Sequence, residues 1–295
     1  MPDSPPLGVT AVMLPELDFD QQVQLCVELG LTHYVFRPRE IPDARRGEPY
    51  SNWGNHAFDL TPRRLADEGS TLADRLEAAG LVPFGTVPRD ADGRDPDRFR
   101  LHLDGAAAAR CRNVRVALPP LPQGVFDWAA YLDDTRDRLA RMLELAAAYP
   151  LKLVIEMHAG SPAVDAAAAR QLCDGSDPDR LGLIFDLPNL SREGIRHAGL
   201  TVSAAGPYLD HAHVGGFTHQ HHPAAQRDDA GFALSGGRMC RLEDNDLHPP
   251  TWLALFRDLH PAAPLILEDY TPDIPGADRL RATTAATRRV LEPPQ

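Results

Sequence analysis

The chain has 295 residues, of which 43% are hydrophobic and 24% are charged, the composition of a folded globular protein rather than a disordered one. Its formal net charge of −12, from 42 acidic and 30 basic residues, opposes nonspecific binding to nucleic-acid phosphates. The N-terminal residues do not resemble a secretory signal, and no apolar run approaches the roughly 20 residues of a membrane-spanning helix; we therefore expect a cytoplasmic protein that binds neither nucleic acid nor a membrane.

Short apolar runs rich in Val, Ile and Leu alternate along the chain with longer amphipathic stretches, the pattern of βαβ units. The apolar runs predict eight strands, over residues 8–14, 32–37, 81–87, 113–118, 151–157, 181–186, 208–214 and 264–269. The amphipathic stretches predict helices that include residues 18–30, 71–80, 128–150 and 163–175, and Gly30 and Gly80 suit helix C-termini. Eight βα units with no linker between them predict a single α/β domain over residues 1–295, a (β/α)₈ TIM barrel.

Two connections are longer than a barrel needs, residues 38–62 after the second strand and 215–249 after the seventh. Both follow the carboxyl ends of strands, where barrel enzymes place their active sites, so we expect them to act as lids. In the first, Trp53 and His56 either wall a sugar pocket or simply pack. The second carries three histidines that either face solvent or cover the substrate: His219, His221 and His222. It also carries three arginines that either bind a carboxylate or phosphate or belong to a charged, mobile loop: Arg227, Arg238 and Arg241.

Four ionisable residues end the last four predicted strands, with spacings of 30, 27 and 55 residues: Glu156, Asp186, His213 and Glu268. A charged group above a barrel core is costly unless it is paired or ligated. Three carboxylates around one imidazole resist joint ionisation, and a divalent cation removes that conflict. Taken singly, each residue could instead cap a helix or bond within a loop, but together they predict a site for one divalent metal ion.

The chain contains a single lysine, Lys152. It lies near the start of the fifth predicted strand, toward the end of the barrel opposite the four ionisable residues. Imine-forming aldolase and pyridoxal phosphate mechanisms need a desolvated lysine in the active site, so neither is expected.

Four short motifs carry a family resemblance: IEMH at strand five, FDLPN at strand six, HAHVGG at strand seven and LILEDY at strand eight. With the opening GVTAVML and EAAGLVPFGTV segments, they resemble the xylose isomerase-like TIM barrel superfamily, the sugar isomerases and epimerases related to endonuclease IV. The resemblance implies that the metal is held by Glu156, Asp186, His213 and Glu268. It also implies that Glu156 and Glu268 move the proton, one removing it from carbon and the other returning it, through a metal-stabilised enediolate.

Three oxygen ligands and one nitrogen favour Mn²⁺, Mg²⁺ or Co²⁺, with Zn²⁺, Fe²⁺ and Ni²⁺ as alternatives. His158 follows Glu156 by two residues and either touches the substrate, pairs with a metal ligand or packs under a loop. Asn189 takes the position where many relatives have a histidine that contacts substrate or a second metal; because asparagine is a poor ligand, it favours one metal over a cluster. His211 shares the face of His213 and would hold a ligand in place. The substrate-binding candidates are His158, Asn189, His211, Arg238, Trp53 and His56.

The sequence departs from the family at two strand ends. Relatives often have a glutamate at the end of strand two, where this chain has Arg37, with Glu40 only later. Strand seven reads HVGG rather than histidine-x-lysine-aspartate. These changes argue against a standard hexose or hydroxypyruvate isomerase but leave the metal ligands in place.

The leading hypothesis is a divalent-metal-dependent isomerase or epimerase of a small sugar, keto-sugar or polyol. The main alternative is a metal-dependent lyase, either a dehydratase of the keto-inositol or dehydroshikimate type or a glycoside-cleaving relative, because both classes begin by removing a proton next to a metal-bound carbonyl. An abasic-site endonuclease would need more ligands and a basic surface, and a non-catalytic binding barrel stays open. Relatives are often dimers or tetramers, so a homo-oligomer is open too, although the sequence shows no interface signature.

Overall fold

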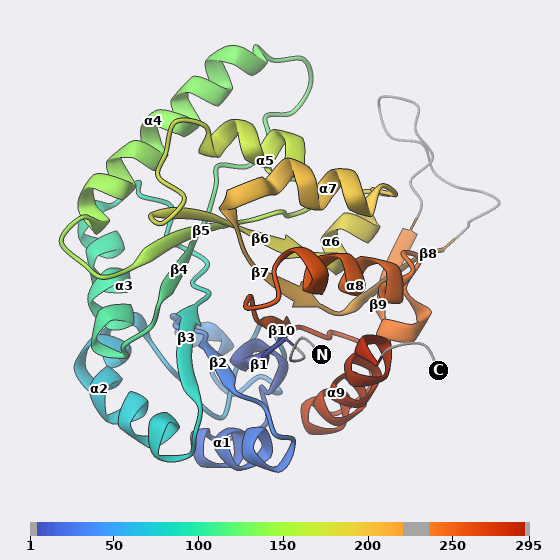
Figure 1. The fold of residues 1–295 in the computed structure, drawn as a ribbon. Coiled ribbons are helices and arrows are strands. Elements are labelled where there is room, and N and C mark those ends of the chain that lie inside the picture. The colour runs from blue at the N-terminus through green and yellow to red at the C-terminus, as the bar shows by residue number, and fades with distance from the viewer. Residues whose placement is uncertain (1–4, 221–235, 293–295) are drawn as a thin grey trace.

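The computed structural model describes residues 5–220 and 236–292. Eight parallel strands close into a barrel in the order β1-β10-β7-β6-β5-β4-β3-β2, and helices cover its outside (Figure 1). The strands β8 and β9 form a separate two-stranded sheet. This closed parallel barrel with helices between its strands confirms the predicted fold class.

All eight predicted strands are present in the barrel. The first was predicted to run to residue 14, but it stops at Thr10, whose hydroxyl accepts a hydrogen bond from the backbone of Val12 and begins a 3₁₀ helix (Ala11–Met13). The barrel strands are β1 (Leu7–Thr10), β2 (His33–Phe36), β3 (Val82–Thr86), β4 (Asn113–Val116), β5 (Lys152–Glu156), β6 (Leu181–Asp186), β7 (Leu209–Val214) and β10 (Leu265–Leu267).

The helices begin and end at residues that suit their termini. At the start of α1, the side chain of Asp18 accepts a hydrogen bond from the backbone of Gln21, and the Gln21 side chain accepts one from the backbone of Asp18, both at 2.9 Å. Gly30 and Gly80 follow α1 and α2 with positive φ angles of 59° and 78°, as predicted for helix C-termini. The helices are α1 (Phe19–Glu28), α2 (Pro62–Ala78), α3 (Pro96–Ala108), α4 (Trp128–Ala146), α5 (Ala166–Cys173), α6 (Leu187–Arg192), α7 (Ala198–Ala205), α8 (Pro249–Leu259) and α9 (Gly276–Leu291). Within the described ranges, no helix has both the length and the apolar character needed to cross a membrane.

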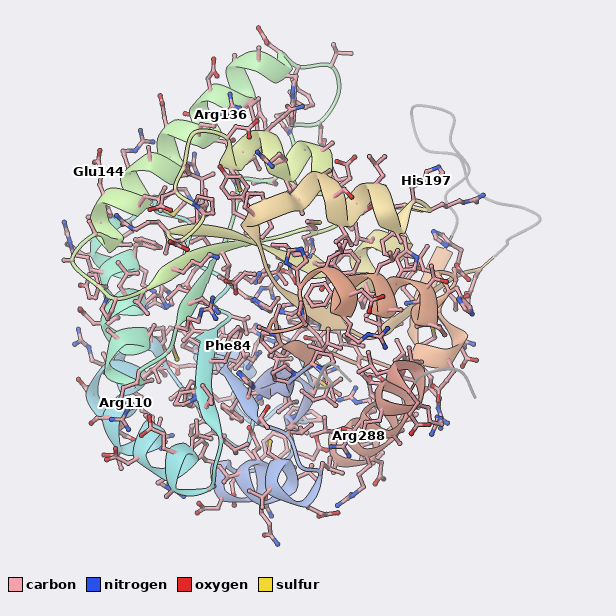
Figure 2. All side chains as sticks on the ribbon, in the orientation of Figure 1. Phe84, Arg110, Arg136, Glu144, His197 and Arg288 are labelled. Atoms are coloured by element: carbon pink, nitrogen blue, oxygen red, sulfur yellow. The ribbon has the colours of Figure 1, made fainter. Side chains whose placement is uncertain are left out.

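Large apolar side chains fill the barrel and the layer between strands and helices. Phe84 on β3 is 2% exposed, and its ring lies 5.3 Å from that of His33 and 5.0 Å from that of His211. Figure 2 shows Phe84 among the strands, whereas Arg110, in the turn after α3, and Arg136, on α4, lie on the outside of the barrel. The interior is therefore a packed core rather than a channel.

A buried ionic network lies near the amino-terminal ends of β5 and β7. The Nζ atom of Lys152 is 2.9 Å from one carboxylate oxygen of Asp210, and Nδ1 of His211 is 2.8 Å from the other. The guanidinium of Arg112 lies 3.7 Å from the same carboxylate, whose side chain is fully buried. Lys152 therefore neutralises a buried charge at the start of its strand.

The two long connections differ in structure. Residues 38–61 contain a 3₁₀ helix (Asp43–Arg45) and otherwise irregular backbone. The predicted lid at 215–249 instead contains β8 (Gly216–Gln220) and β9 (Gly236–Cys240), which pair antiparallel with Phe217 opposite Met239. These strands are short and rich in glycine and polar residues, so they lack the alternation by which strands are found in sequence.

Candidate metal centre and substrate cavity

The four predicted metal ligands meet at the carboxyl ends of four adjacent barrel strands. Glu156 and Asp186 are the last residues of β5 and β6, His213 is the last but one of β7, and Glu268 follows β10 directly. One ligand atom from each lies within 4.8 Å of those of the other three, and all four residues are buried. The order β10-β7-β6-β5 around the barrel explains why residues so distant in sequence converge.

The imidazole of His213 is the hub of this cluster. Its Nδ1 atom lies 3.1 Å from Glu156, 3.2 Å from Asp186 and 2.5 Å from Glu268, measured to carboxylate oxygens. Burial opposes the charged imidazole, but the charge of Glu268 and the hydrogen bonds to the carboxylates raise the pKa of His213 well above its ordinary value. A positive charge at this point is thus strongly favoured.

The pKa values of Asp186 and Glu156 are shifted in opposite directions. Burial first, and then the charges of Glu156 and Glu268, raise the pKa of Asp186 to about 7, even though the hydrogen bond from His213 lowers it. Burial also acts to raise the pKa of Glu156, but the guanidinium of Arg115 and the contact with His213 outweigh it and hold this pKa well below its usual range. One imidazolium therefore does not fully compensate three buried carboxylates.

The donor set fits a divalent metal ion. Three carboxylates and one imidazole are ordinary ligands for Mn²⁺, Mg²⁺, Co²⁺, Zn²⁺ and Fe²⁺, and a dication would remove the repulsion that raises the pKa of Asp186. The second ring nitrogen of His213 is buried and has no hydrogen-bond partner among the described residues.

Further side chains hold the ligands in place. The Nε atom of Arg115, on β4, lies 2.6 Å from Glu156 in an ion pair that is not aligned as a hydrogen bond. The hydroxyl of Tyr270 donates a hydrogen bond to Glu268. The backbone of Asn189 donates to Asp186 at 2.7 Å, because Asp186 also caps the N-terminus of α6. Such contacts fix the orientation of metal ligands.

The carboxylate of Asp269, next in the chain after Glu268, is 2% exposed and anchors this corner of the barrel. It accepts hydrogen bonds from the backbone and the hydroxyl of Thr271, at 2.7 and 2.6 Å, and from the hydroxyl of Thr283 on α9 at 2.5 Å. The segment that carries Glu268 is thereby tied to α9.

A cavity of about 540 Å³ opens above the cluster, and all four ligands line it. This volume lies in the usual range for sites that bind small molecules. Phe217, Met239, Trp53 and Tyr270 supply apolar surface, and the rings of Trp53 and Tyr270 lie 5.0 Å apart. The hairpin of β8 and β9 and the 38–61 segment therefore both contribute to the wall.

Three of the six predicted substrate-binding residues line this cavity: His158, Asn189 and Trp53. The other three do not. His211 lies below the cluster with its ring bonded to Asp210, and His56 is buried and bonded to the carbonyl of Asn52 at 3.2 Å. Arg238 is exposed on β9, next to the cavity-lining Met239 but not itself in the wall.

Among the residues singled out in the predicted lid at 215–249, those that the structure describes do not act together in the cavity wall. His219 on β8 pairs with Asp246 at 2.6 Å and contacts the carbonyl of Arg192, so it anchors the hairpin. His221, His222 and Arg227 lie outside the described residues.

Sequence reasoning missed several residues of the cavity. Arg115 interrupts the apolar strand NVRVAL, and Tyr270 follows Glu268 by two residues, so both carried a signal that pointed to the site. Arg37, Arg39 and Arg89 also line the cavity; of these, only Arg37 was noticed, as a departure from the family pattern.

Comparison with known proteins places the chain in a family. No curated protein sequence matches it. Among solved structures it is similar to the IolI protein with a bound zinc atom (TM-score 0.71, 13% identity, 97% of this chain and 98% of that one) and to the probable 3-DHS dehydratase AsbF from Bacillus anthracis (0.70, 13%, 96% and 98%). It is also similar to an L-ribulose 3-epimerase (0.68, 12%, 97% and 94%), and at these identities the likeness shows the fold. The sequence itself matches a family over residues 23–285, so the chain belongs to the xylose isomerase-like TIM barrels, as its motifs predicted.

Proposed function

We propose that the protein is a divalent-metal-dependent isomerase or epimerase of a small sugar, keto-sugar or polyol. The observation that carries this proposal is the buried cluster of Glu156, Asp186, His213 and Glu268 at the base of a cavity of about 540 Å³. The strand order places Glu156 and Glu268 at the two ends of the row, with the other two ligands between them. Two carboxylates from different strands thus face one small-molecule cavity.

A divalent ion held by these four residues would polarise a substrate carbonyl and make the neighbouring C–H more acidic. Arg115 keeps Glu156 in the ionised form that a proton acceptor needs. Glu268 accepts a hydrogen bond from Tyr270, which orients this second carboxylate at the other end of the row, where it would return the proton. The apolar side chains of Trp53 and Phe217 restrict water around the reacting carbon.

The test begins with elemental analysis of protein purified without chelator, in which we expect about one equivalent of a divalent metal. A panel of keto-sugars and cyclic polyols is then incubated in deuterium oxide with each candidate metal, and exchange at carbon is followed. Glu156→Gln and Glu268→Gln should each slow exchange at least about 100-fold, whereas Glu243→Gln, an exposed control, should not. Full metal affinity and turnover in the Glu268→Gln protein would contradict the proposal.

A lyase is the second candidate, supported by the similarity to the probable dehydratase AsbF. Both reactions begin when a carboxylate removes a proton beside a carbonyl, and they differ in whether a hydroxyl then leaves. Deuterium at carbon without loss of water would assign the isomerase or epimerase. New ultraviolet absorbance from an enone would assign the lyase.

A further inference from the structure

Three arginines line the cavity on the side away from the metal ligands. Arg37 and Arg39 follow β2, and Arg89 follows β3. In the closed barrel, β2 and β3 are separated from the ligand-bearing strands by β1 on one side and β4 on the other. The cavity therefore has an acidic half and a basic half.

These three guanidiniums have no paired carboxylate in the part of the chain that the structure describes. Across residues 5–220 and 236–292, none of the three forms an ion pair with an acidic side chain. Arg37 is only 7% exposed, and its guanidinium donates a long hydrogen bond of 3.4 Å to the carbonyl of Gly54. Arg39 donates to the carbonyl of Trp53, and the guanidinium of Arg89 lies 5.8 Å from the centre of the Trp53 ring.

The acidic residues of this region are already engaged elsewhere. Arg98 pairs with Glu40 at 3.4 Å and with Asp90 at 2.7 Å. Asp59 pairs with Arg46 at 3.1 Å. The cavity arginines are thus left facing one another, and burial together with the charge of Arg39 lowers the pKa of Arg37 to about 10.

A nearly buried guanidinium without a counter-ion is costly, and a bound anion removes that cost. Arginine is also the side chain whose planar fork best matches the oxygens of carboxylates and phosphates. Trp53 joins the two halves of the cavity, because its ring contacts both Arg89 and Tyr270, the partner of Glu268. A ligand that lies along Trp53 would reach both halves.

We propose that the substrate is anionic: a keto-sugar or polyol with a phosphate or carboxylate group, which Arg37, Arg39 and Arg89 bind while the carbonyl end lies at the metal ligands. The inference rests on the proposed function for the placement of the carbonyl end. The anion subsite itself stands on the arginines alone, so the two can fail separately.

The first test measures binding of inorganic phosphate and of malonate by calorimetry, using protein treated with chelator so that no metal can hold the anion. We expect binding of one or both by the unmodified protein, weakened at least 10-fold in Arg37→Met and Arg89→Met. Arg141→Met is the matched control, because Arg141 is an exposed arginine on α4 outside the cavity, and its variant should bind like the unmodified protein. The stronger of the two anions identifies phosphate or carboxylate as the group recognised.

The second test compares kcat/KM for paired keto-sugars with and without the anionic group. The unmodified protein should prefer the charged member at least 10-fold, and Arg89→Met, whose exposed site makes misfolding a small risk, should lose that preference mainly through KM. Absence of anion binding by the chelated protein, or equal effects of Arg89→Met and Arg141→Met, would overturn the inference. Anion binding without turnover of any sugar would instead contradict the proposed function and leave the subsite standing.

Discussion

Replacing Lys152 with methionine tests the buried network beneath the metal centre. Burial acts to raise the pKa of Asp210, but His211 and Lys152 outweigh it and hold this pKa well below its usual range. A carboxyl whose folded pKa is lowered contributes stability above its unfolded pKa of about 3.9, and this contribution is lost as the pH falls through that region. The stabilisation by Lys152 should therefore be complete at pH 7.

Removing one partner of a buried ion pair typically costs about 3–5 kcal/mol. His211 at 2.8 Å and the exposed Arg112 at 3.7 Å still face Asp210 in the variant, so we expect the lower end, about 3 kcal/mol. Urea denaturation at pH 7, followed by circular dichroism with excess chelator, measures the loss without interference from metal binding. The double variant Lys152→Met/Asp210→Asn should recover at least half of it, since no buried charge is left alone.

An unfolding free energy of Lys152→Met within about 0.5 kcal/mol of the unmodified protein at pH 7 would contradict this prediction. A double variant less stable than Lys152→Met would contradict the prediction as well. The difference between the unmodified protein and Lys152→Met should also shrink as the pH is lowered toward 4, because Asp210 then becomes protonated in the variant.

Three further predictions concern the residues around the metal centre. Because the pKa of Asp186 is raised to about 7, the stability that its protonated form contributes is present at low pH and lost as the pH rises through 7. Urea denaturation of chelated protein should therefore give a lower unfolding free energy at pH 8 than at pH 5, and Asp186→Asn should reduce that difference. Parallel pH profiles of the two proteins would contradict this prediction. Tyr270→Phe removes the hydroxyl that donates to Glu268, so metal affinity or kcat should fall about 10- to 100-fold, measured by metal titration and by turnover. Thr283→Val removes a hydrogen bond to the buried carboxylate that follows Glu268 in the chain and should lower the unfolding free energy by about 2 kcal/mol. Thr284→Val, whose hydroxyl bonds only within its own helix, should cost less than about 1 kcal/mol, and equal losses would exclude a special role for the first bond.

The barrel and the convergence of the four candidate ligands were predictable because their signals are local and repeated. Each strand is a short apolar run, and each ligand stands at the end of such a run, so topology alone brings Glu156 and Glu268 to one place. His211 shows the limit of this reasoning. It shares the inward face of β7 with His213, but two residues correspond to a full layer of the barrel interior, which puts His211 beside Asp210 rather than in the cavity.

The basic half of the cavity could not be predicted in the same way. Arg39 and Arg89 lie in irregular segments after β2 and β3, and in a sequence with many charged loop residues they look like any other surface arginine. Whether these arginines are free to bind an anion depends on which acidic neighbours already pair with other residues, and that pairing is set by the three-dimensional structure. The hairpin of β8 and β9 escaped prediction for a related reason, since its strands are defined by each other rather than by an apolar pattern.

Because of the order of the strands around the barrel, the two halves of the cavity come from different parts of the chain. Its acidic floor comes from residues 156–268, whereas Arg37, Arg39 and Arg89 all precede the fourth strand. Exchange of the first half of the chain between related barrels would therefore replace the basic wall and keep every ligand of the floor. Recombination at the fourth strand offers a simple route by which such a protein could acquire a new substrate while retaining its reaction.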